Sequence, residues 1–157
     1  MLSRTLSVLV LALALAGSHV AAQGHDHAAM AMGFDQKATV HHFHLFTDGG
    51  AIDVSARSAT DLASRDAIRR HLAHIAQRFG DGDFALPMIV HDRDDVPGTA
   101  GMASRKDRIQ YRYADTPQGG RVDIVTTDPA ALEAVHQFLA FQIRDHGTGD
   151  SLAPGRR

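Results

Sequence analysis

Three histidines lie close together in the segment Val40–Phe46, at positions 41, 42 and 44. Polar and apolar residues alternate here, which predicts a β-strand, and a strand directs residues two apart to the same face, about 6–7 Å from each other. The imidazoles of His42 and His44 can therefore share a metal ion. Asp53, on the next expected strand, points the same way and can be an oxygen ligand or hold a ring nitrogen. Alternatively, these histidines are solvated or cover a homodimer interface.

A secretory signal is expected at the amino terminus. Residues 1–22 have a short basic start, an apolar run and a small-residue end, which are the three parts of a signal peptide. The apolar run is too short to span a membrane, which takes about 20 residues. We expect cleavage after Ala22, and export of the remaining chain to the periplasm or beyond.

Cleavage at this position creates a second candidate metal site. Gln23, Gly24 and His25 then supply a free amine, two backbone amides and an imidazole, the square-planar donor set that suits Cu(II) or Ni(II). His27 and two methionines follow in the tail 23–33, which we expect to be flexible. The site requires that Gln23 does not cyclise, and a solvated tail without a ligand is the alternative.

The segment 84–107 is long for a connection and rich in His, Met and Asp. Long connections inside compact domains are often binding loops. We therefore take His91 and Met102 as further ligand candidates. Met88 and Ile89 are expected to form an additional buried strand.

His71 and His74 are three residues apart in a helical pattern, so they can reach one metal ion. However, the matching stripe of the second expected helix carries Phe138 and Phe141. We therefore expect both histidines to pack beside these rings where the two helices meet, with a lowered pKa for His71.

Composition limits the classes of function. The 157 residues include 44% hydrophobic and 22% charged residues, with a formal net charge of −2, no cysteine and 11 histidines. Such a chain fits one globular domain, and without a basic excess it is not expected to bind nucleic acid. Without cysteine, a metal site must use His, Met, Asp, Glu or the backbone. None of the common catalytic motifs is present.

Two parts of the chain share one pattern that would position these residues. Each has two strand-like segments around a turn with paired glycines, Gly49-Gly50 and Gly119-Gly120, followed by a helical pattern. The second helix begins at Asp128-Pro129, a helix-capping residue followed by proline in the first helical position. The sequence therefore predicts a duplicated ββα-ββα arrangement.

The predicted fold class is α+β, a four-stranded antiparallel sheet with two helices packed on one face. We expect one domain over 34–150, made of repeats 39–83 and 108–150 joined by a loop at 84–107, followed by a disordered segment 151–157. The alternation of the strands divides their side chains between two faces. The side expected under the helices has Phe43, Leu45, Ile52, Val54, Ile109, Tyr111, Tyr113, Val122 and Ile124. The helix-free face has His42, His44, Asp53, Ser55, Gln110, Arg112 and Asp123.

The chain also resembles a family of small exported bacterial proteins to which no activity is assigned. The resemblance would cover about 32–150, and it implies export and one compact domain without assigning a site. It is carried by Met32-Gly33-Phe34, His41-His42-Phe43, Asp48-Gly49-Gly50, His71-Leu72-x-His74-Ile75-Ala76, Gly119-Gly120-Arg121-Val122-Asp123-Ile124 and Phe138-Leu139-x-Phe141-Gln142-Ile143-x-x-His146-x-Thr148-Gly149-Asp150.

The leading hypothesis is an exported metal-binding protein that handles copper, with zinc or nickel as alternatives. A second hypothesis is an enzyme or ligand-binding domain that uses His42, His44, His91 and Asp53 in a cleft between the sheet and the segment 84–107. A third is an interaction module that binds a partner through the helix-free face without metal.

Overall fold

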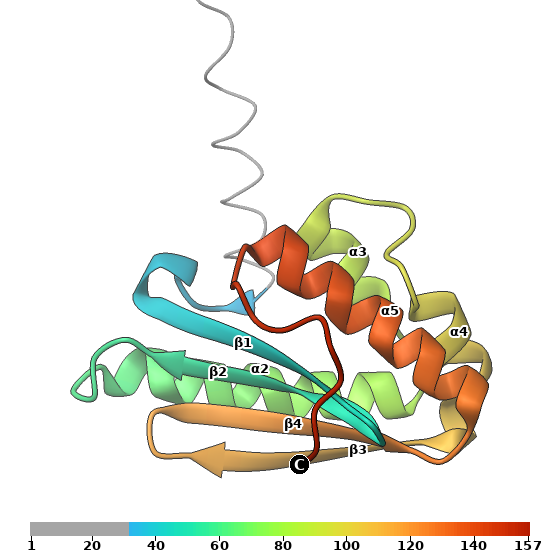
Figure 1. Ribbon diagram of the computed structural model, residues 1–157. Helices are drawn as coiled ribbons and strands as arrows, with labels where there is room; N and C mark the ends of the chain where they lie inside the picture. The colour runs from blue at the N-terminus through green and yellow to red at the C-terminus, as the bar shows by residue number, and fades with distance from the viewer. Residues whose placement is uncertain (1–31) are drawn as a thin grey trace, which may run out of the picture.

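The computed structural model describes residues 32–157, which form one four-stranded sheet with helices (Figure 1). The strands are β1 (Thr39–Phe46), β2 (Gly49–Ala56), β3 (Ile109–Thr116) and β4 (Gly119–Thr126). The α-helices are α2 (Leu62–Gly80), α3 (Ala85–His91), α4 (Thr99–Ser104) and α5 (Pro129–His146), and the short 3-10 helices are η1 (Gln36–Ala38) and η2 (Lys106–Arg108).

The sheet is antiparallel throughout, with the strand order β1-β2-β4-β3. The two hairpins therefore meet through their second strands, and β1 and β3 are the edges. Glycines make this central pairing possible. A Cβ on Gly49, whose φ is +141°, would lie 2.0 Å from the Ile124 carbonyl oxygen, and one on Gly119 would lie 2.1 Å from that of Val54. The α+β class and the four-stranded antiparallel sheet are confirmed.

The two long helices cover the same face of the sheet, α2 over β3 and β4 and α5 over β1 (Figure 1). Each begins at an aspartate whose carboxylate accepts a backbone amide hydrogen, from Ser64 to Asp61 and from Ala131 to Asp128. The start of α5 at Pro129 agrees with the sequence prediction. Gly147, with φ +61°, ends this helix in the left-handed conformation.

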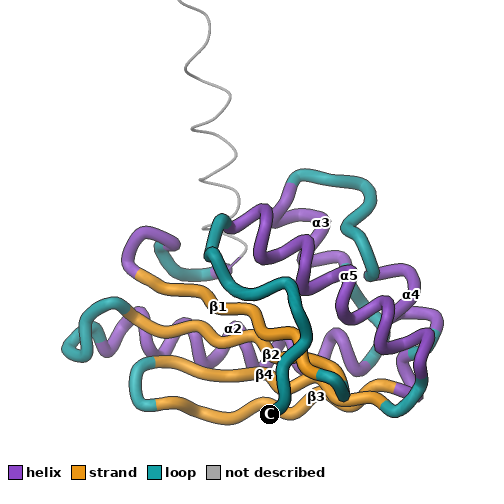
Figure 2. Tube along the Cα trace, viewed as in Figure 1, coloured by secondary structure: helices purple, strands orange, loops and turns teal. Residues whose placement is uncertain are grey.

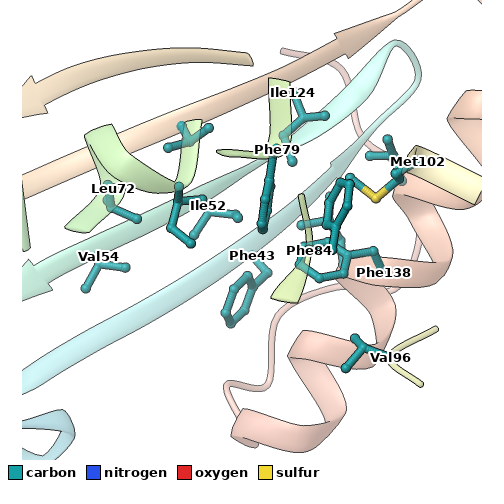
Figure 3. Close-up of a cluster of buried hydrophobic side chains, with 14 of the residues drawn as sticks. Phe43, Ile52, Val54, Leu72, Phe79, Phe84, Val96, Met102, Ile124 and Phe138 are labelled. Atoms are coloured by element: carbon teal, nitrogen blue, oxygen red, sulfur yellow. The ribbon is translucent and has the colours of Figure 1, made fainter. Parts of the chain in front are cut away.

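The core lies between the sheet and the helices. Three aromatic rings pack on one another here, with ring centres 4.4 to 6.4 Å apart (Figure 3). They belong to Phe79 of α2, to Phe84 just before α3, and to Phe138 of α5. Met102 is completely buried beside them. Met32 and Phe34 also belong to the core, with 6% and 7% of their surface exposed. The ordered domain therefore begins by residue 32, before the expected boundary at 34.

The segment 84–107 is not a loop, because it contains α3 and α4 (Figure 2). Met88 and Ile89 therefore lie in a helix, and the strand expected for them was wrong. Ile89 is 57% exposed, whereas Leu86, Pro87 and Val90 face the interior. A short apolar run fits a strand and a helix equally well, and here the spacing of the buried residues is helical.

The carboxyl-terminal segment 151–157 was expected to be disordered, but the structure pairs it with the sheet. The Gly155 amide donates to the Leu45 carbonyl oxygen (2.9 Å), and its own carbonyl accepts from the Thr47 amide (3.0 Å). The edge strand β1 has unpaired backbone groups, and the segment satisfies some of them. Arg157 adds ion pairs with Asp48 and Asp123. The segment thus runs from the end of α5 down across the sheet (Figure 2).

Candidate functional site

His42 and His44 share the helix-free face of β1, as expected. Their ring centres are 6.3 Å apart, and their side chains are 49% and 38% exposed. His42 Nδ1 lies 2.9 Å from an Asp150 carboxylate oxygen, and His44 Nε2 lies 3.1 Å from one of Asp53. Each imidazole is thus oriented by a carboxylate through one ring nitrogen. We call these four residues the open-face site.

Asp53 is also paired with a cation. The Arg121 guanidinium donates to the same Asp53 oxygen that faces His44. This ion pair uses carboxylate capacity that a metal would need, so Asp53 suits the role of holding His44 better than that of a ligand.

Asp150 is a site residue that the sequence analysis missed. It follows α5 by four residues, and the sequence analysis gave it no role in a site. Its carboxylate accepts from the Phe43 amide (2.9 Å) as well as facing His42. Partial burial alone would raise the pKa of Asp150. The hydrogen bonds from Phe43, Thr148 and His42 outweigh burial and lower the pKa below its ordinary value.

A second cluster of histidines lies on the other side of β1. His41 of β1, His71 of α2, His91 of α3 and His146 of α5 line one cavity of about 70 Å³. Met32, Gln142 and apolar side chains complete the wall, among them Phe43, Leu72, Phe79 and Phe138 (Figure 3). No Asp, Glu, Lys or Arg side chain lines this cavity among the residues described. We call it the histidine cavity.

The imidazoles of the histidine cavity contact one another and nearby aromatic rings. Ring centres are 5.3 Å apart for His41 and His146, 5.2 Å for His91 and His146, and 5.4 Å for Phe34 and His71. Burial, together with the neighbouring histidines, lowers the pKa of His41, His71 and His146 to about 4. These three imidazoles are therefore neutral at pH 7.

His91 differs from the others because both ring nitrogens are engaged. Nδ1 lies 2.7 Å from an Asp145 carboxylate oxygen, and Nε2 lies 3.0 Å from the Gln142 side-chain oxygen. Gln142 is only 4% exposed, and its side-chain nitrogen is buried without a partner. The side-chain amide of Gln142 can also be placed the other way round, with its nitrogen donating to His91. Its oxygen then occupies the buried position that has no partner. Either orientation leaves one polar atom of Gln142 without a partner.

Two other expectations about histidines were wrong. His74 is exposed on α2, and His71 packs on Phe34 rather than beside Phe141. The reason is that α3 contributes side chains to the space between α2 and α5, and the long helices contact each other through Phe79 and Phe138 instead. Phe141 packs against His91 instead, with ring centres 5.0 Å apart. The lowered pKa expected for His71 agrees with the structure.

The remaining candidates do not form one site. Met102 is completely buried in the core and does not line the cavity that His91 lines. His91 is on the helix side of the sheet, whereas His42, His44 and Asp53 are on the other side, so the catalytic cleft proposed for these four residues does not exist in that form. Gln23, Gly24, His25 and His27 lie outside the described residues, as does the expected signal peptide.

Three further observations concern the described part of the chain and its likeness to other proteins. Within residues 32–157, no three or more His, Asp or Glu side chains are arranged so that they could hold a metal ion together. In the same range, no helix is both long and apolar enough to cross a membrane. No family model, curated protein or solved structure matches this chain.

Proposed function

We propose that this protein is an exported metal-binding protein that handles copper, and that the open-face site is its site within the fold. The arrangement of His42 and His44 carries the proposal. Each imidazole has one ring nitrogen oriented by a carboxylate, which leaves the other available for a metal. Metal-binding histidines in proteins are usually held in this way, because the carboxylate fixes the ring and makes the free nitrogen more basic.

The separation of the two rings fits a shared ion. A metal–nitrogen bond of about 2.0–2.1 Å and about 1.2 Å from nitrogen to ring centre allow two centres on one ion to be up to about 6.4–6.6 Å apart. The observed 6.3 Å is close to this limit. The nitrogens that would hold such an ion are His42 Nε2 and His44 Nδ1, because the other nitrogen of each ring faces a carboxylate.

The rest of the donor inventory supports copper. The chain has 11 histidines and 5 methionines but no cysteine. Gln23, Gly24 and His25 form the proposed amino-terminal chelate after export, with His27 beside it. Zinc or nickel is the alternative for either site.

A titration of the mature chain, beginning at Gln23, tests both sites. We expect it to bind Cu(II) at two positions. Acetylating the amine of Gln23, or changing His25→Ala, should abolish the square-planar spectrum of the tail, because that chelate needs the free amine and the imidazole. The double change His42→Asn and His44→Asn should remove the remaining Cu(II), measured by calorimetry and electron paramagnetic resonance.

The control for the double change is His74→Asn, since His74 is an exposed histidine on α2, across the sheet from the open-face site. This variant should bind Cu(II) like the parent chain. The proposal fails if a chain lacking the tail donors, His42 and His44 binds Cu(II) undiminished, or if the parent chain binds none.

We also infer that the two halves, 39–83 and 108–150, are repeats of one ββα unit. The matched hairpins, the paired glycines at each turn and the aspartate at the start of each long helix support this origin. The two histidines of the open-face site have no counterparts in the second half, because Gln110 and Arg112 occupy the strand positions that match His42 and His44.

A further inference from the structure

We propose that the histidine cavity is a second metal site, selective for Cu(I), with the imidazoles of His41 and His146 and the thioether of Met32 as its ligands. The three residues come from distant parts of the chain: the segment before η1, strand β1 and the last turn of α5. The fold brings them into the wall of one cavity. This site lies across the sheet from His42 and His44, so it does not depend on the function proposed for that face.

The spacing of the two imidazoles permits a shared ion. Their ring centres are 5.3 Å apart with the ring planes inclined by 22°, and this distance lies within the limit of about 6.4–6.6 Å set by ordinary metal–nitrogen bonds. Met32 is 6% exposed and lines the same cavity. Thioether donors favour Cu(I) over harder ions.

The absence of ionised side chains from the described wall determines the charge of the ion. A metal ion in this cavity has no carboxylate to balance it, so its desolvation is compensated only by neutral donors. The cost of desolvation rises with the square of the charge and is about four times greater for a divalent than for a monovalent ion of the same size. The histidine cavity should therefore accept Cu(I) and reject Zn(II) and Cu(II).

The size of the cavity points to an ion rather than an organic ligand. A cavity that binds benzene has a volume of about 150 Å³, roughly twice the 70 Å³ found here. Gln142, whose side-chain nitrogen is buried without a partner, also lines this space, so the wall is not wholly apolar. His91 is held by Asp145 and Gln142, so it supports the wall beside His146 instead of binding the ion.

The test uses the full mature chain with the other proposed donors removed: His25→Ala, His27→Ala, Met30→Leu, His42→Asn and His44→Asn. Anaerobic titration with Cu(I) against the chromophoric competitor bicinchoninate should show one retained equivalent. Titration with Zn(II) should show none. X-ray absorption should detect a sulfur ligand together with nitrogen ligands.

Two further substitutions in this background identify the ligands. Met32→Leu keeps the volume of the side chain and should weaken Cu(I) binding at least tenfold while removing the sulfur signal. His146→Asn should abolish binding. The matched controls are Met102→Leu, a buried methionine outside the cavity, and His74→Asn, an exposed histidine; both should bind Cu(I) like the background chain.

The proposal is overturned if the background chain retains no Cu(I), if it binds Zn(II) as tightly, or if Met102→Leu has the same effect as Met32→Leu. Should His146→Asn fail to fold, as judged by circular dichroism, the sulfur signal and its loss in Met32→Leu decide the question. Failure of the open-face site leaves this result unchanged, because the background chain lacks those donors.

Discussion

Neighbouring residues of β1 have opposite environments, and this determines their chemistry. His41 faces the buried histidine cavity, whereas the adjacent His42 is half exposed and faces the carboxylate of Asp150. The period of a strand is sufficient to predict this division. The partners of each histidine could not be predicted, because Asp150 and His146 are more than 100 positions away in the sequence and their approach depends on the packing of α5.

At the residue scale, His71 should remain neutral well below the usual range. Its pKa is lowered from 6.5 to about 4 by burial and then by the nearby His74. An NMR titration of the ring protons should therefore give a midpoint near pH 4 for His71. A midpoint near 6.5 would show that the ring is solvated and that its packing against Phe34 is wrong.

At the scale of elements, both hairpins and both long helices could be predicted because their signals are local. Turn glycines, helix-capping aspartates and a regular apolar period all lie within the element that they define. Helices α3 and α4 could not be predicted from their short apolar runs, since such runs fit a strand and a helix equally well. The pairing of segment 151–157 with β1 was missed for another reason. It joins residues more than 100 positions apart in the sequence, Phe46 and Gly155, so no local pattern indicates it.

The central pairing of β2 with β4 should be the element contact most sensitive to a small substitution. Gly49→Ala places a methyl group 2.0 Å from the Ile124 carbonyl oxygen, and we expect a loss of about 3 kcal/mol in the free energy of unfolding. Chemical denaturation measures this loss. Gly149→Ala is the control, because Gly149 also has positive φ but no atom near its Cβ position; it should cost about 1 kcal/mol. Equal losses would mean that the backbone conformation, and not the close approach, sets the requirement for glycine.

At the scale of the whole molecule, the histidine cavity makes the fold sensitive to acid. The pKa of His41, His71 and His146 is about 4 in the folded state against 6.5 for an ordinary histidine. The unfolded chain therefore takes up protons first as the pH falls, and stability present above pH 6.5 is lost between 6.5 and 4. Each residue contributes up to about 3 kcal/mol, and because the neighbouring histidines influence one another the total is smaller than the sum of the three.

Calorimetric melting from pH 7.5 to 4 checks this dependence. The melting temperature should fall steeply below pH 6.5, and His71→Asn should flatten the curve, because asparagine does not titrate. The exposed His74 provides the comparison, and His74→Asn should keep the steep curve. A parent chain whose melting temperature is constant over this range would show that its buried imidazoles are protonated without cost.

The carboxyl-terminal segment also affects how copies of the chain can associate. A sheet with two free edges can add strands at both sides, and identical molecules then polymerise without limit. Here the chain's own Gly155 occupies backbone groups of β1, and among residues 32–157 nothing comparable lies along the outer edge of β3. One open edge allows one neighbour, so edge-to-edge pairing ends with a closed two-fold dimer in place of a fibre.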